Sequence, residues 1–238
     1  MTDQSIEEIN RGLRLASAKM SYPVLKDLAY FREYNNYVEN TFESSILELG
    51  ENPQNKDGRA IPLDFEIIKR VSERNKYRSF RNIMRVSLLT ALCSFIENLV
   101  KTACVINDRK ERYSSYGSEI KARKNADKRV ISISKSFLYK EGFSEINNLK
   151  GWDYIKDMMR IRNRFVHAGG EADSNIRKMS VRYDFLIEND EITLGDSFIE
   201  NYISLIEDFS IEFAKIVYPD ESFVKKMVER YNNHRNNK

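Results

Sequence analysis

The sequence predicts an all-α fold with one small β-hairpin in its last third. Apolar residues recur at intervals of three and four along most of the 238 residues, which is the spacing of helices that bury one face. Residues that break helices are scarce, with 9 Gly and 4 Pro. The hydrophobic content of 41%, which includes 13 Tyr and 13 Phe, is enough to fill a core.

The first part of the chain predicts two helices and a loop. One helix is expected over residues 5–20. A second is expected to begin at Pro23, because proline is common in the first turn of a helix, and to run to residue 49. Residues 50–62 are polar and contain glycine and proline, so they predict a loop. We expect residues 1–62 to form an N-terminal helical extension.

A long core helix is predicted over residues 64–107, and helical segments are expected to resume near Val130 and Ser144. The most apolar part of the core helix contains Met84, Leu88, Leu92, Phe95, Ile96 and Leu99.

The next helix is predicted over residues 152–168. Two glycines at 169–170 follow it, and glycine readily takes the left-handed conformation that closes a helix. Residues 179–187 and 191–194 then predict a β-hairpin, with its turn at the Asn-Asp pair 189–190.

The C-terminal part predicts two more helices. Asp196 is expected to cap the first of them, and Pro219 to close it. Residues 221–231 predict a last helix before a disordered polar tail. We expect one domain over residues 63–218 and a C-terminal helix with tail over 219–238. The apolar face of the first of these helices contains Phe198, Ile199, Tyr202, Leu205, Ile206, Phe209 and Phe213.

Positive charge is concentrated in two runs, although the net charge is only +3. Residues 69–85 contain seven basic residues and one acidic residue, and residues 109–129 contain eight basic and three acidic residues. Such runs are often solvated helix faces. Two of them in one chain also favour contact with the phosphates of a nucleic acid.

Several classes of protein are disfavoured. Cys93 and Cys104 lie eleven positions apart in one predicted helix, too far to form a disulfide or share a metal, and no phosphate-binding glycine loop is present. We expect no metal and no cofactor. We also find no signal peptide and no stretch approaching the ~20 apolar residues of a membrane span, so we expect a cytoplasmic protein that does not bind membranes.

Chemistry is concentrated in the helix over residues 152–168. The chain has 2 His, and His234 lies in the polar tail, so His167 is the candidate for catalysis. Projected at about 100° per residue, the helix has a polar stripe with Lys156, Arg160 and Asn163 beside His167. Its core-facing stripe contains Tyr154, Met158, Ile161, Phe165 and Ala168.

A second apolar sector of this helix contains Ile155, Met159 and Val166, and Arg162 lies beside it. We expect this sector to pack on a second copy of the chain around a two-fold axis, which would bring Arg162 and His167 of the two copies together.

The residues Arg162 to His167, R-N-x-x-x-H, resemble the motif of HEPN domains. Upstream, LLTALCSFIENLVK (88–101) resembles the central helix of that family, with Glu97 at its acidic position. Downstream, the hairpin and amphipathic helix over 179–217 are similar to the family's continuation. The resemblance covers residues 64–217 and none of the first 60.

The resemblance implies a helical homodimer with a composite active site, of the RiboL-PSP-like or a related toxin or phage-defence kind. Such a protein is an endoribonuclease that cuts RNA without metal and leaves 2′,3′-cyclic phosphate ends. An antitoxin or another regulatory protein is the expected partner. The chain would then be a HEPN-like helical bundle.

The resemblance also assigns roles. Arg162 would stabilise phosphoryl charge with its planar guanidinium, His167 would transfer protons near neutral pH, and Asn163 would orient the imidazole or the phosphate. Lys156, Arg160 and Arg164 would bind the substrate, and Glu97 is a possible supporting residue.

Each assignment has a structural alternative. His167 is also placed to cap the helix, Arg162 to pair with Glu97, and Lys156 and Arg160 to be solvated. The alternative function is a HEPN-like module without catalysis that binds RNA, nucleotide or protein. A helical scaffold that binds an acidic partner or a membrane through residues 69–85 is a third hypothesis.

Overall fold

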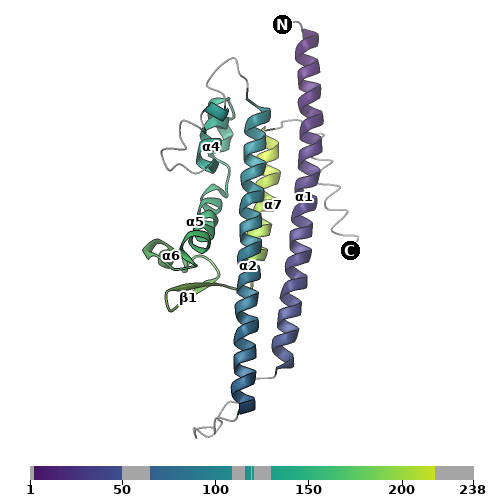
Figure 1. The fold of residues 1–238 in the computed structure, drawn as a ribbon. Coiled ribbons are helices and arrows are strands. Elements are labelled where there is room, and N and C mark those ends of the chain that lie inside the picture. The colour runs from purple at the N-terminus through teal and green to yellow at the C-terminus, as the bar shows by residue number, and fades with distance from the viewer. Residues whose placement is uncertain (1–2, 50–64, 109–115, 119, 121–129, 218–238) are drawn as a thin grey trace. The chain divides into compact units, whose positions relative to one another are not determined.

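The computed structural model describes residues 3–49, 65–108, 116–118, 120 and 130–217 (Figure 1). It is mainly helical with one two-stranded antiparallel sheet, which confirms the predicted fold class. The elements are α1 (Asp3–Glu48), α2 (Phe65–Ile106), α4 (Val130–Lys140), a 3-10 turn (Ser144–Asn147), α5 (Trp152–Ala168), α6 (Ser174–Met179), β1 (Phe185–Glu188), β2 (Glu191–Leu194) and α7 (Phe198–Val217).

The chain divides into two compact units. Unit 1 takes residues 1–30, 91–160 and 202–238, and unit 2 takes residues 31–90 and 161–201. The long helices contribute to both units.

Unit 1 has an aromatic core on the predicted apolar face of α7. Trp152, the first residue of α5, donates its indole N–H to the carbonyl of Ile146 at 2.8 Å. Its ring lies edge-on to Phe209, with 4.8 Å between the ring centroids. Gly151 has a φ of 97°, and a Cβ there would lie 3.3 Å from the Phe209 ring. The glycine therefore permits the close approach of α5 and α7.

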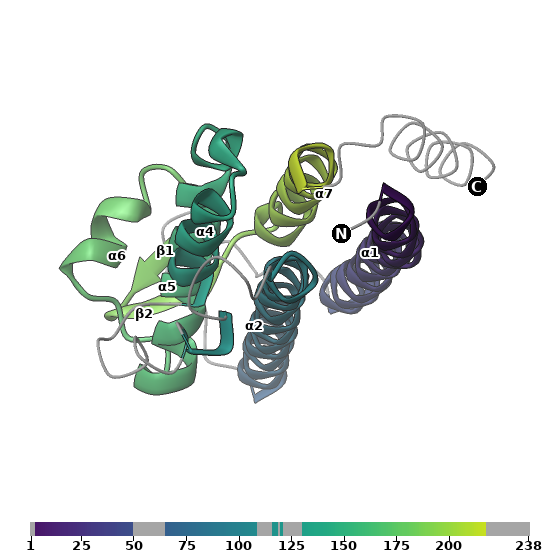
Figure 2. The ribbon, with the colours of Figure 1, turned by 90° about the horizontal axis from the view of Figure 1, so that it is seen from above.

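Unit 2 contains the hairpin, which is shorter than predicted. Phe185 pairs with Leu194 and Glu188 with Glu191, and Asn189 and Asp190 take positive φ in the turn. The prediction of a strand from residue 179 is wrong, because residues 174–179 form α6 (Figure 2).

Asp173 caps α6, its side chain accepting hydrogen bonds from the backbone N–H groups of Asn175 and Ile176. An aspartate before a short helical segment is a start signal that can be recognised in the sequence. The Asp173 cap favours helix over residues 174–179, so Met179 ends α6 and does not begin a strand.

The predicted break before Pro23 is also wrong, because α1 is continuous from Asp3 to Glu48. A proline removes one backbone hydrogen bond from a helix interior. Leu25 and Leu28, which follow directly, are fully buried. Burial of these two side chains offsets the free energy lost with that hydrogen bond.

Asp196 does not cap α7 as predicted. The helix begins at Phe198, and the carbonyl that accepts its first hydrogen bond, from Asn201, belongs to Ser197. The carboxylate of Asp196 instead accepts a hydrogen bond from Arg85 at 2.7 Å.

One described helix, over residues 68–106, is long and apolar enough to cross a membrane, which differs from the expectation from sequence. Only 39% of its most apolar window is buried, and core helices of soluble proteins pass the same test.

Several predicted features lie outside the described residues. They are the loop over residues 50–62, all charged residues of the run 109–129, Pro219, the helix over 221–231 and His234.

Candidate functional site

The Arg162–His167 motif occupies the last turns of α5, as the sequence predicted. The helix ends where Gly169 and Gly170 take φ values of 60° and 89°. The N–H of Gly170 then donates to the carbonyl of Arg164 at 3.0 Å. A left-handed residue after the last turn closes the helix and fixes where His167 lies.

Arg164 holds the turn that follows α5. Its Nε donates to the carbonyl of Glu171 at 2.5 Å, and its Nη1 lies 3.8 Å from the carboxylate of Asp173. The Arg164 guanidinium therefore stabilises this turn, whereas the sequence predicted only that it binds the substrate.

The three motif side chains differ in exposure. His167 is exposed, whereas Arg162 and Asn163 are half-buried and the Nε of Arg162 is fully buried. Within the described part of the chain, neither Asn163 nor His167 makes a side-chain hydrogen bond or ion pair. Two polar groups at the end of this helix are therefore available to a ligand.

Helix geometry separates the motif side chains into two directions. Asn163 and His167 are four residues apart and diverge by about 40°, while Arg162 and His167 diverge by about 140°. Val166 lies between those two and is 51% exposed. A single copy of α5 therefore does not point Arg162 and His167 at one atom.

The prediction that the whole second apolar sector of α5 packs on a second copy of the chain is wrong. Ile155 and Met159 are buried within the chain itself, and only Val166 of the sector is exposed. A helix projection shows which residues share a face, but not whether another part of the same chain covers it.

The remaining predicted residues lie in unit 1. Lys156 pairs with Asp153 at 3.0 Å, and this hydrogen bond lowers the pKa of the Asp153 carboxyl. Arg160 is half-buried.

Burial raises the pKa of Tyr202, and the charges of Cys93 and Glu97 raise it further. Glu97 thus acts electrostatically on a core tyrosine.

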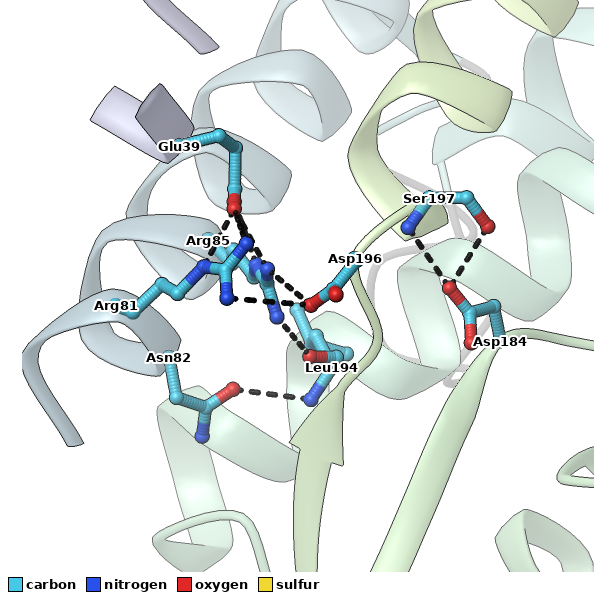
Figure 3. A network of polar contacts seen from close by, with 8 residues as sticks. All are labelled: Glu39, Arg81, Asn82, Arg85, Asp184, Leu194, Asp196 and Ser197. Atoms are coloured by element: carbon cyan, nitrogen blue, oxygen red, sulfur yellow. Dashed lines mark hydrogen bonds and ion pairs between the residues drawn. The ribbon is translucent and has the colours of Figure 1, made fainter. Parts of the chain in front are cut away.

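A second polar cluster, the Arg85 network, lies in unit 2 (Figure 3). The buried Arg85 binds Glu39 through Nε at 2.6 Å, the carbonyl of Leu194 through Nη1 at 2.6 Å, and Asp196 through Nη2 at 2.7 Å. Arg81 binds Glu39 as well. Burial alone would lower the pKa of Arg85, but the hydrogen bonds to Glu39 and Asp196 outweigh it and raise this pKa.

Asn82 joins the Arg85 network to the hairpin. Its amide oxygen accepts a hydrogen bond from the N–H of Leu194 at 3.0 Å (Figure 3). Its amide nitrogen donates to the carbonyl of Ile192 at 3.3 Å. The sequence prediction missed this network. The available signal was a charged residue, Arg85, at the start of the most apolar part of α2, where a guanidinium needs a partner.

The hairpin in turn holds the end of α5. The N–H of Ile192 donates to the carbonyl of Gly170 at 3.0 Å, and the N–H of Ala172 donates to that of Asp190 at 2.7 Å. The turn after His167 is therefore fixed through β2 to α2, and through Glu39 to α1.

Among the residues that the structure describes, no group of three or more His, Cys, Asp or Glu side chains has a geometry that could hold a metal ion. Comparison with protein-family models, curated proteins and solved structures finds no match for this chain.

Proposed function

We propose that the chain is a metal-independent endoribonuclease of the HEPN type, acting as a toxin or phage-defence effector in the cytoplasm. One observation supports this most directly. The R-N-x-x-x-H motif ends a helix, and its Asn163 and His167 side chains make no hydrogen bond or ion pair with other described residues.

The chemistry needs only groups that this helix carries. Removal of the proton from a ribose 2′-hydroxyl lets that oxygen attack the adjacent phosphorus, and the 5′-oxygen leaves as it gains a proton. The products are a 2′,3′-cyclic phosphate and a 5′-hydroxyl. His167 transfers these protons, Arg162 binds two phosphoryl oxygens, and Asn163 orients the imidazole or the phosphate.

The helix geometry supports the further proposal of a homodimer with a composite site. Because Arg162 and His167 diverge by about 140° on one helix, a phosphate that meets both needs groups from two copies. The exposed Val166, which lies between them, is the apolar contact for such a two-fold interface. Activity of this kind needs restraint in the cell, so we propose an antitoxin or regulatory protein as a partner.

The test is incubation of the purified protein with mixed RNA in EDTA, followed by mapping of the ends. Wild type should produce cyclic-phosphate ends, and His167→Ala and Arg162→Lys should not, because lysine lacks the bidentate geometry of arginine. Lys178→Ala, an exposed substitution in α6, is the matched control and should cleave like wild type. Equal cleavage by wild type and His167→Ala would contradict the proposal.

Complete inactivity of wild type, with RNA binding retained, would favour the alternative of a HEPN-like binding module without catalysis. Sedimentation at micromolar concentration tests the dimer independently. A strictly monomeric wild type would contradict the composite site.

A further inference from the structure

The N-terminal half of α2 carries an exposed stripe that no function described so far uses. At about 100° per residue, the stripe members fall within about 80° of one another and are spaced by three or four residues. All are exposed, and all lie in unit 2. We define the α2 stripe as Phe65, Lys69, Ser72, Lys76, Phe80 and Ile83.

The stripe combines two aromatic and two cationic side chains, with both lysines between the two phenylalanines. Phe65 and Phe80 are 74% and 45% exposed, which is high for rings that could otherwise be buried in a core. The ammonium of Lys76 lies 5.7 Å from the centroid of the Phe80 ring.

The basic run that contains the stripe divides into two parts. Arg81 and Arg85 are neutralised by Glu39 and Asp196. By contrast, Lys69, Arg70 and Arg78 are exposed, and none of them pairs with a carboxylate among the side chains that the structure describes. The positive charge available to a partner is therefore confined to the part of α2 that carries the exposed rings.

We infer that the α2 stripe is a docking surface for single-stranded RNA. Cations spaced along a helix attract phosphates, and exposed rings stack on unpaired bases of any sequence. The stripe runs over residues 65–83, or about 27 Å of helix, which is enough for on the order of four nucleotides.

A second copy of the chain fits this surface less well. A two-fold contact of the stripe with itself would bring the lysines of both copies into one interface, and like charges there cost affinity. A membrane surface would favour a continuous apolar face with cations at its margins. In the α2 stripe the lysines stand between the rings instead.

This inference deepens the proposed function, on which it rests for the identity of the strand as RNA. Asn82, next to Ile83 at the end of the stripe, donates a hydrogen bond to Ile192 and accepts one from Leu194, both in the hairpin that holds the turn after His167. A strand on the stripe would thus be bound by the same unit that carries the motif.

The experiment measures binding, not cleavage, by fluorescence anisotropy in the full-length His167→Ala background. The probe is a labelled oligouridine RNA of about 20 nucleotides. The pair Lys69→Gln/Lys76→Gln should weaken binding about tenfold at ~0.1 M salt and reduce the slope of log K against log salt by about 1.4. Phe80→Leu should weaken binding at least fivefold through lost stacking, as about 1 kcal/mol or more per base implies.

Matched controls exist elsewhere in the chain. Lys101→Gln/Lys178→Gln removes two exposed lysines from α2 and α6 and leaves the same net charge as the stripe pair. Tyr139→Leu removes an exposed ring from α4. Both controls should bind like the parent, and all variants should melt at the parent's temperature.

Equal losses in the stripe and control pairs, unchanged binding in the stripe variants, or tighter binding of duplex RNA than of the single strand would overturn the inference. So would binding to phosphatidylserine vesicles with no binding to RNA. Retained stripe-dependent binding in a wild type that never cleaves would overturn the proposed function alone.

Discussion

The Arg85 network and the end of α5 are two polar clusters of unit 2 with opposite properties. In the network, the guanidinium of Arg85 is buried and bonds to two carboxylates and one carbonyl. At the end of α5, the side chains of Asn163 and His167 make no hydrogen bond or ion pair with any described residue. Buried polar groups are normally paired for stability. Open polar groups at a fixed helix end are more useful for binding and chemistry, so the two clusters should respond differently to substitution.

The largest effect is expected for Arg85→Ala. Removing the guanidinium takes from the mostly buried Glu39 the more buried of its two arginine partners, leaving Arg81, and removes the donor to the Leu194 carbonyl. We expect a loss of about 3–5 kcal/mol in the free energy of unfolding, measured by urea denaturation. A loss below about 1 kcal/mol would contradict the view that the Arg85 network stabilises the fold more than the end of α5 does. Arg78→Ala, an exposed arginine on the same helix, is the control and should change stability little.

Gly195→Ala should also destabilise the protein, and Gly195 lies beside the Arg85 network, directly before Asp196. A Cβ at this position would overlap the carboxylate of Asp184. That carboxylate cannot move freely, because it accepts hydrogen bonds from the backbone N–H and the hydroxyl of Ser197 at 2.9 and 2.7 Å. We expect a cost of about 1–3 kcal/mol, measured by thermal and urea unfolding. Gly117→Ala is the control, because it would add a Cβ that meets nothing within 4 Å and, as at Gly195, the φ of this residue is not positive.

Acid should weaken the Arg85 network. The hydrogen bond from Arg85 lowers the pKa of the Asp196 carboxyl, and the charges of Arg81 and Arg85 lower it further. A lowered folded-state pKa contributes stability above the unfolded pKa, near 3.9, and this contribution is lost as pH falls through the folded value. We expect Asp196→Asn to flatten the fall in stability below about pH 4. Parallel pH profiles for wild type and Asp196→Asn would contradict this role.

The smallest effect on stability is expected at the end of α5. His167→Ala and Asn163→Ala should change the free energy of unfolding by less than about 0.5 kcal/mol, because neither side chain makes a hydrogen bond or ion pair with a described residue. The same variants should lose RNA cleavage under the proposed function. Circular dichroism melts alongside the cleavage assay separate the two results. A large loss of stability in His167→Ala would mean that the histidine serves the fold instead.

The local parts of this fold were predictable from sequence. The bounds of α5 match those predicted, since apolar periodicity and the glycine pair act within one helix. The helix predicted over 64–107 is likewise observed as Phe65–Ile106. The motif at the end of α5 was found for the same reason, but its chemical role stays a prediction.

The missed features depend on contacts between distant residues. Arg85 meets residues 46 and 111 positions away in Glu39 and Asp196, and helix periodicity carries no information about such pairs. The burial of Ile155 and Met159 within the chain was missed for a related reason, since their cover comes from other elements.

The hydrogen bonds to β2 have a consequence for aggregation. In a sheet of two strands, each strand has an outer edge whose unpaired N–H and C=O groups can template the addition of another chain. The outward groups of Ile192 and Leu194 on β2 are all occupied, by Gly170, Asn82 and Arg85. Side chains of α2 thus take the place of a third strand, and β2 offers no template for intermolecular β pairing while the Arg85 network is intact.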